Sequence, residues 1–233
     1  MSMSQVPGDG PRLERPSLSR SQEDYLKQIF LLGNGGESVS TRDLSERLNV
    51  RPASVTGMIQ RLAEQGLVSH RPYRGVSLTE GGRRVALKML RHHRLLETFL
   101  EQVLGYGWDE VHEEAERLEH VISERFEARI AETLGHPTHD PHGDPIPDAD
   151  LRLPAGADEV RLSWVAAGES ATLTRVGTQD KDSLGVLSRL GLVPGVRVAV
   201  VETGAAELTV VVDRETFPLP AELAGELWVR EDE

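Results

Sequence analysis

The hydrophobic pattern of this 233-residue chain changes period once, and that change constrains the fold more than any other feature. Up to about residue 134, apolar side chains recur every three or four positions, which is typical of amphipathic helices. From about residue 160, short apolar runs such as GVRVAVV and ELTVVV are separated by Gly and Pro, which is typical of strands in a small β barrel. Residues 136–158 between them are rich in Pro and Asp and predict a largely irregular segment. We therefore expect a multi-domain α+β protein.

The first 80 residues predict a winged helix-turn-helix. A helix is expected over 21–32, with Ser21 and Asp24 forming a start that resembles a capping box. A short second helix follows, and a third opens at Arg51-Pro52, where Pro suits a first helical turn. Beyond it, apolar and polar residues alternate around a turn at 72–75 and predict a hairpin. Two helices joined by a short turn and followed by a basic hairpin match the geometry of DNA-reading domains.

Side chains on the third helix and the hairpin suit contact with a DNA duplex. Ser54 and Thr56 can hydrogen-bond to phosphates or base edges, and Ala53 can touch a thymine methyl group. Arg51 and Arg61 can reach a phosphate or a guanine, and phosphate contact is the preferred assignment for the arginines. A winged-helix fold used for protein contacts, or an ordinary solvated helix, is the alternative interpretation. The expected DNA-binding residues are Thr41, Arg51, Ala53, Ser54, Thr56, Arg61, Arg71, Tyr73 and Arg74.

The net charge of -12 argues at first against a nucleic-acid partner. Its distribution weakens that objection, because residues 1–80 carry ten basic and nine acidic side chains, whereas residues 136–233 carry eight and eighteen. The acidity is concentrated toward the C-terminus. A nearly neutral N-terminal segment can still present a local basic cluster to DNA.

Two absences from the sequence narrow the chemistry. The chain has no Cys, so thiolate nucleophiles and thiolate metal ligands are excluded, and any metal must be held by nitrogen and oxygen. It also has no apolar run of about 18 residues and no secretory signal pattern, so we expect a cytoplasmic protein with no membrane partner.

Potential metal ligands gather on two long helices expected over 83–104 and 108–134. On the second, His112, Glu116, Glu119 and His120 fall within an arc of about 100°, at about 100° per residue. His93 and Glu97 lie one turn apart on the first. If the two helices pack side by side, these donors converge, and Asp24 on the first helix of the chain is a candidate seventh ligand.

A single helical Glu or His is usually solvated or structural, but several buried carboxylates without a cation would be costly or would have to protonate. The set therefore indicates a metal site. Nitrogen and oxygen donors favour Mn²⁺ first and Fe²⁺ second, with Zn²⁺, Co²⁺ or Cd²⁺ as substitutes in vitro. The zinc-protease spacing H-E-x-x-H is not met, because Glu116 stands where His is needed. The remaining histidines are interpreted as structural or exposed: His92, His136, His139 and His142.

Six segments are distributed over the chain up to residue 147: QEDYLKQIF, VRPASVTGMIQRL, GVSLTEGGRR, HRLLETFL, VHEEAERLEHVIS and GHPTHDPHGDPIP. With these segments the chain resembles, across essentially its whole length, the diphtheria toxin repressor family, which includes the iron-dependent regulators and the manganese transport regulators. The resemblance implies a winged-helix domain over 1–80, a helical metal-binding and dimerisation domain over 81–147, a linker over 148–159, and an SH3-like, FeoA-type barrel over 160–233.

The resemblance also divides the expected ligands into two sites. A primary site would use Asp24, Glu116, Glu119 and His120, and an ancillary site would use His93, Glu97 and His112. Iron-responsive members carry Met and Cys where this chain has Asp24 and Glu116, so the harder ligand set favours manganese. Lys27 replaces a second carboxylate of the short manganese regulators, which argues against their binuclear site. Ligation by the C-terminal barrel, near Asp180 and Ser183, is left open.

The function expected from this resemblance is that of a homodimeric repressor of metal uptake genes, which binds a double-stranded operator when metal is plentiful and is not an enzyme. Three alternatives belong to other classes: a winged-helix regulator controlled by a non-metal ligand, a metal-dependent hydrolase, and a metal-binding protein with no DNA role. Metal-dependent DNA affinity distinguishes the first interpretation from all three.

Overall fold

The computed structural model describes residues 18–71, 74–154, 156 and 158–231. The chain divides into two compact units, Met1–Arg83 and Arg84–Glu233. Within the described residues, no helix is both long enough and apolar enough to cross a membrane.

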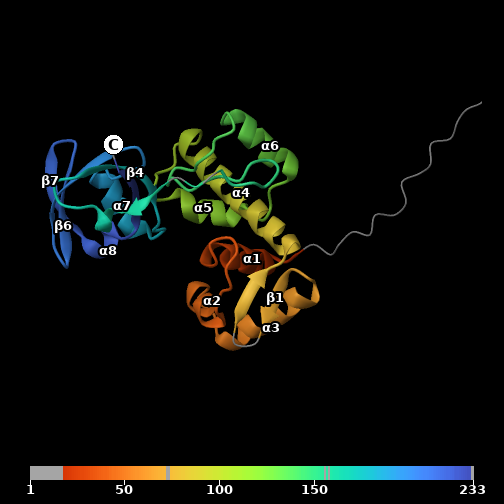
Figure 1. Cartoon of the computed structure of the whole chain (residues 1–233). Helices are drawn as coiled ribbons and strands as arrows, with labels where there is room; N and C mark the ends of the chain where they lie inside the picture. The colour runs from red at the N-terminus through yellow and green to blue at the C-terminus, as the bar shows by residue number, and fades with distance from the viewer. Residues whose placement is uncertain (1–17, 72–73, 155, 157, 232–233) are drawn as a thin grey trace, which may run out of the picture. The chain divides into compact units, whose positions relative to one another are not determined.

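The first unit is a winged helix-turn-helix (Figure 1). Its elements are α1 (Arg20–Leu32), α2 (Thr41–Arg47), α3 (Pro52–Glu64), β1 (Val68–Arg71) and β2 (Gly75–Leu78). The prediction that Ser21 and Asp24 form the N-terminal cap of the first helix was wrong. Ser19, not Ser21, accepts from the backbone of Gln22, whose side chain accepts from the Ser19 backbone in return. Both serines stand three residues before a polar partner, so the local pattern alone does not choose between them.

The hydrophobic residues of the three helices and the wing meet in one core. Leu26, Leu44, Val55, Ile59 and Leu62 are all buried, one or more from each helix. The wing is tied to the loop before α2, because Val39 and Val76 form an antiparallel bridge. Gly75 adopts a φ of 83°, and a Cβ there would overlap the carbonyl oxygen of Val39. The start of β2 therefore requires glycine.

Three helices form the N-terminal part of the second unit: α4 (Glu80–Gln102), which begins just before the unit boundary, α5 (Val111–Leu118) and α6 (Glu124–Thr133). The prediction of one helix over 108–134 was wrong, because the chain leaves the helical path at residues 119–123. Ser123 then starts α6 by accepting from the backbone N–H of Phe126. No Gly or Pro marks this break. Glu119 and His120 consequently lie in a turn and not on the continuous helix face that the sequence suggested.

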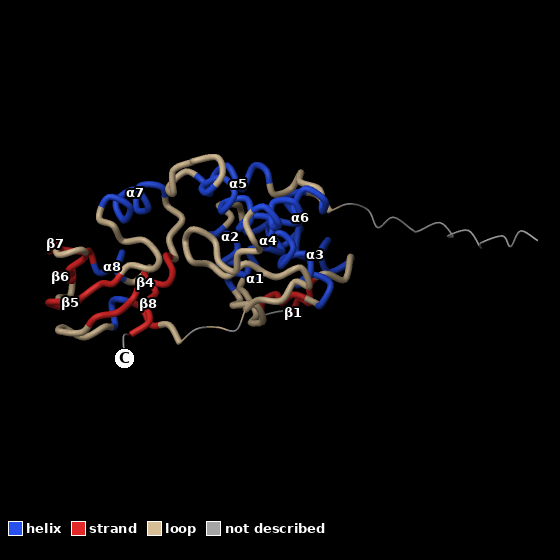
Figure 2. Tube along the Cα trace, turned by 90° about the horizontal axis from the view of Figure 1, so that it is seen from above, coloured by secondary structure: helices blue, strands red, loops and turns tan. Residues whose placement is uncertain are grey.

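The C-terminal part of the same unit is an antiparallel six-stranded sheet with the strand order β3-β8-β4-β5-β6-β7. Figure 2 shows these strands gathered to one side of the helices α4 to α6. Alternate residues are buried, for example Leu208, Val210 and Val212 on β6. This is the SH3-like, FeoA-type domain expected from the sequence. Its elements are β3 (Val160–Arg161), the 3-10 helix η1 (Leu162–Trp164), β4 (Ser170–Val176), α7 (Lys181–Arg189), β5 (Arg197–Thr203), β6 (Glu207–Val212), β7 (Glu215–Pro220), α8 (Ala221–Ala224) and β8 (Leu227–Glu231).

Candidate metal centre and nucleic-acid interface

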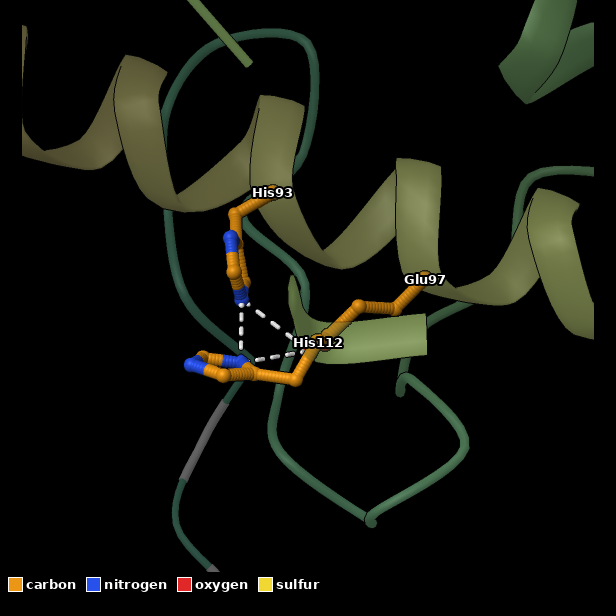
Figure 3. A group of neighbouring side chains, drawn as sticks. All are labelled: His93, Glu97 and His112. Carbon is orange, nitrogen blue, oxygen red and sulfur yellow. Dashed lines mark hydrogen bonds and ion pairs between the residues drawn. The ribbon is translucent and has the colours of Figure 1, made fainter. Parts of the chain in front are cut away.

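Three side chains from α4 and α5 point toward one another in the helical part of the second unit (Figure 3). His93 and Glu97 lie one turn apart on α4, and His112 comes from the first turn of α5. His93 Nε2, Glu97 Oε1 and His112 Nδ1 are each 3.0 Å from the other two. Two ligands at a right angle around an ion, with bonds of about 2.1 Å, are separated by about 3.0 Å. This triangle of donors therefore fits one face of a metal coordination sphere.

The orientation of His93 agrees with a ligand role. Its Nδ1 lies 2.6 Å from Oε2 of Glu119, and an ionised carboxylate can only accept a hydrogen bond. Nδ1 therefore carries the proton, and a neutral ring then turns the lone pair of Nε2 toward Glu97 and His112. A carboxylate that fixes the far nitrogen of a histidine is the usual support for a metal-binding imidazole.

Glu97 is buried, but its surroundings stabilise the ionised form of its carboxylate. Burial by itself raises its pKa, but in the metal-free protein the attraction of a protonated His93, together with the proximity of the imidazoles of His112 and His142, outweighs that effect. The pKa of Glu97 is thus held well below its usual range. Three imidazoles around one buried carboxylate give a site that is rich in ligand atoms.

A second group shares Glu97 and includes two residues that the sequence analysis did not select. Glu97, Asp140 and His142 are all buried, and one ligand atom from each lies within 4.8 Å of the others. His142, interpreted from the sequence as structural or exposed, is buried. His136 and His139, which belong to the same segment, are exposed. The available signal was a carboxylate and an imidazole two residues apart in DPHGD, beside a glycine.

The geometry of His142 also leaves one nitrogen available. Nε2 lies 3.1 Å from the backbone carbonyl oxygen of Trp108 and therefore donates to it. In the neutral ring, Nδ1 then presents a lone pair to Glu97, whose Oε2 is 3.9 Å away, beyond hydrogen-bonding distance. Two ligands of one ion can be separated by such a distance, so Glu97 can contribute one oxygen to each group.

The residues of the expected primary site differ in their burial and in the unit of the chain to which they belong. Glu119 is buried, and His120 Nε2 lies 3.5 Å from its Oε1. Glu116 is half exposed, and its Oε1 lies 3.7 Å from Nε2 of His112. Asp24 belongs to α1 in the first unit. Its participation with Glu119 and His120 remains a prediction.

Asp180, the candidate ligand from the barrel, serves as a helix cap. Its Oδ2 accepts from the backbone N–H and the hydroxyl of Ser183, at 2.9 and 2.8 Å. The backbone hydrogen bond and then the hydroxyl hydrogen bond lower the pKa of Asp180. This carboxylate already has a structural function at the start of α7.

The expected DNA-binding residues that the structure describes belong to the first unit, where they lie at the start of α2, along α3 and its N-cap, and in the β1–β2 hairpin. Thr56 donates through Oγ1 to the carbonyl oxygen of Pro52 at 3.1 Å, and Thr41 is half-buried at the start of α2. Tyr73 falls outside the described residues. The side chains that are exposed, and so accessible to a duplex, are Arg51, Ala53, Ser54, Thr56, Arg61, Arg71 and Arg74.

A winged helix joined to a helical domain with a buried His and carboxylate cluster defines the class of metal-dependent DNA-binding regulators. The comparisons with known proteins agree. Residues 17–76 match the N-terminal DNA-binding domain of the iron-dependent repressors, residues 79–148 match their metal-binding and dimerisation domain, and residues 160–231 match the FeoA domain.

The chain is similar over most of its length to named repressors. The iron-dependent repressor IdeR of Mycobacterium tuberculosis is 36% identical over 214 residues, which cover 87% of this chain and 93% of that protein. Among solved structures, a manganese-dependent transcriptional repressor in complex with manganese is 41% identical, with a TM-score of 0.84 over 91% of this chain and 100% of the other. ScaR with bound Zn²⁺ is 30% identical, with a TM-score of 0.77 over 91% and 99%.

The chain belongs to the iron-dependent repressor family. It is a metal-dependent, DNA-binding transcriptional repressor and not an enzyme. The predicted family, fold class and general function are confirmed, and the alternatives from other classes are not supported.

Proposed function

We propose that this chain acts as a homodimeric, Mn²⁺-dependent repressor of metal uptake genes, with Fe²⁺ as a second activator. The observation that carries the proposal is the triangle of 3.0 Å distances between His93, Glu97 and His112. Its donors are nitrogen and oxygen alone, which suits Mn²⁺ and Fe²⁺ better than metals that recruit sulfur. The similarity to a manganese-dependent repressor supports the same choice.

Two groups of ligands are assigned in this proposal. His93, Glu97 and His112 form the ancillary site, next to Asp140 and His142. The primary site consists of Asp24, Glu116, Glu119 and His120. When bound, the cation supplies the positive charge that neutralises these carboxylates.

The primary ligands provide the switch, because they come from both units of the chain. Without a cation, Asp24 is repelled by Glu116 and Glu119, which leaves α1 free to move relative to the dimerisation helices. With the charges neutralised, Asp24 joins the other ligands and restricts α1. A preference of about 100-fold for the DNA-binding state would shift the equilibrium by roughly 2.7 kcal/mol.

Exposed apolar side chains of the dimerisation domain provide a surface for a second copy of the chain. Val121, in the turn between α5 and α6, is 60% exposed, and Phe126, in the first turn of α6, is 47% exposed. A dimer formed there would present two winged helices to half-sites separated by about one helical turn of DNA, roughly 34 Å. Ser54 and Thr56 would then face base edges, while the arginines of α3 and the wing contact phosphates.

The test is DNA affinity of the full-length protein for a fragment from its own upstream region, measured by fluorescence anisotropy with chelator and then with Mn²⁺, Fe²⁺ or Zn²⁺. We expect weak binding with chelator and tight binding with Mn²⁺. Glu97→Gln should abolish the response, whereas Glu113→Gln, an exposed carboxylate on α5, should keep it. Equal DNA affinity with and without metal would instead support control by a non-metal ligand.

A further inference from the structure

The segment Asp140–Asp144, here called the DPHGD segment, is fastened to strand β4 of the C-terminal domain. The backbone N–H of Val176 donates to the carbonyl oxygen of His142 at 2.8 Å. Gly143 adopts a φ of 86°, and a Cβ there would overlap the carbonyl oxygen of Thr174. The segment can approach β4 this closely only because position 143 is glycine.

Trp108 makes a second set of contacts with the same segment. Its indole Nε1 donates to the carbonyl oxygen of Pro141 at 2.9 Å, and its own carbonyl oxygen accepts from Nε2 of His142. The two rings lie 4.9 Å apart. Trp108 also packs against the hydrophobic core of the C-terminal domain. One side chain thereby links that core to the backbone and to the imidazole of the segment.

These contacts fix the two side chains that face Glu97. The hydrogen bond to Trp108 sets the ring orientation of His142 and leaves Nδ1 on the Glu97 side. Oδ1 of Asp140 accepts from the backbone N–H groups of His142 and Asp144, both at 2.9 Å, so the carboxylate orientation depends on the fold of the segment. The segment forms a turn, closed by the hydrogen bonds from the Asp140 N–H to the Asp144 carbonyl oxygen and from the Gly143 N–H to the Asp140 carbonyl oxygen, both 3.0 Å long, and its contacts with β4 and Trp108 position that turn.

We infer that the C-terminal domain is a clamp for the metal centre, in which β4 and Trp108 position Asp140 and His142 beside Glu97. This rests on the proposed function, because it assumes that the Glu97 centre binds Mn²⁺. Supporting contacts around metal ligands typically contribute a factor of 10 to 100 in metal affinity. Since coupling is reciprocal, Mn²⁺ must also strengthen the attachment of the segment to β4.

Matched variants of the full-length protein test the clamp by Mn²⁺ affinity, measured calorimetrically and by the electron paramagnetic resonance spectrum of bound Mn²⁺. Gly143→Ala should weaken Mn²⁺ binding at the Glu97 centre at least 10-fold. Gly168→Ala is its control, because Gly168 also has a positive φ, of 91°, but nothing lies within 4 Å of an added Cβ. Trp108→Phe should weaken binding a few-fold, and Trp164→Phe, at a residue 71% exposed, should not.

Glu97→Gln separates the failure of the clamp from failure of the proposed function. If it leaves Mn²⁺ binding intact, the metal centre itself is misassigned. If Glu97→Gln removes Mn²⁺ binding while Gly143→Ala and Gly168→Ala bind Mn²⁺ with equal affinity, the assignment of the metal centre is supported and the clamp is refuted.

Hydrogen exchange of the wild-type protein gives a test that does not depend on a variant folding. The Val176 amide should exchange at least several-fold more slowly with Mn²⁺ than with chelator. Equal exchange rates in the two conditions would overturn the coupling.

Discussion

Glu119 lies 2.6 Å from Nδ1 of His93, so a carboxylate of the expected primary site also orients a histidine of the ancillary site. Both side chains are buried. The two predicted sites are therefore coupled through one direct hydrogen bond, and a substitution at either site should alter metal binding at the other.

Replacing Glu119 by Gln should weaken metal binding at both sites. The amide has no charge to attract the Nδ1 proton of His93, and the His93 tautomer is then no longer fixed. We expect Mn²⁺ affinity at the His93 site to fall by about 10-fold or more. Titration calorimetry checks this, with Glu113→Gln as the control. Loss of binding at only one of the two sites would refute the coupling.

Asp140→Asn should stabilise the metal-free protein and weaken Mn²⁺ binding. Burial raises the pKa of Asp140 well above its usual value, and the charges of Glu97 and Asp144 raise it further. The charged carboxylate therefore opposes folding, while an asparagine oxygen can keep both backbone hydrogen bonds. We expect a gain of about 1 kcal/mol in the free energy of unfolding.

Urea denaturation in chelator, followed by Mn²⁺ titration, tests this trade-off. The control is Asp150→Asn, because Asp150 is exposed and pairs with Arg152. A variant less stable than the wild type in chelator would show that Asp140 contributes favourable ion pairing, for example with Arg94.

Glu127 supports the helical domain through a buried ionic network. Its carboxylate contacts Arg91 Nε at 2.5 Å and His92 Nε2 at 2.9 Å, while Nδ1 of His92 lies 3.0 Å from the carbonyl oxygen of Glu119. Both nitrogens of His92 therefore lie within hydrogen-bonding distance of an oxygen atom. Glu127→Gln should cost about 3 kcal/mol of unfolding free energy at pH 7, because it leaves the buried guanidinium of Arg91 without its counter-charge.

This cost should depend on pH in a defined direction. Burial raises the pKa of Glu127, but hydrogen bonds from His92 and Arg91, and the charges of both, lower it to a net value below the ordinary 4.5. The stability it contributes is therefore present above pH 4.5 and is lost as the pH falls through the lowered pKa. Denaturation curves of wild type and variant should converge at acid pH. Glu124→Gln, which removes an exposed pair with Lys88, should change little throughout.

The sequence was informative where ligands lie on regular helices. His93 and Glu97 are one turn apart on α4, and helix periodicity alone places them on one side. Their meeting with His112 required only that α4 and the next helix pack together. The winged helix was equally predictable, because periodicity, Pro52 at a helix start and a basic hairpin all indicated the same fold.

Other parts of the site depend on contacts that no local pattern encodes. Asp140 and His142 lie in an irregular segment that closes its own turn but is positioned by contacts with Val176, Thr174 and Trp108, all distant in sequence. The break before Ser123 contains no Gly or Pro. Helix periodicity therefore predicted that Glu119 lies on a helix face, although the helix ends at Leu118. There, tertiary contacts and a serine cap outweigh helix propensity.

Arg61, the one arginine within α3, is proposed to bind DNA through a phosphate. Arg61 is exposed in the last turn of α3, and its expected partner is a phosphate. Arg61→Ala should weaken binding to all DNA sequences alike and lower the slope of log K against log salt by about 0.9 for each phosphate that is no longer neutralised. Ser54→Ala, by contrast, should leave the salt slope unchanged and relax the preference for one base pair by about 1 kcal/mol or more.

Anisotropy titrations with Mn²⁺ at several salt concentrations, on the operator and on a scrambled duplex, distinguish these two roles. Arg129→Ala is the control, because that arginine is exposed on α6 and pairs with Glu132. If Arg61→Ala changes the preferred sequence but keeps the salt slope, α3 lies in the groove with Arg61 against a base edge, and the phosphate assignment is wrong.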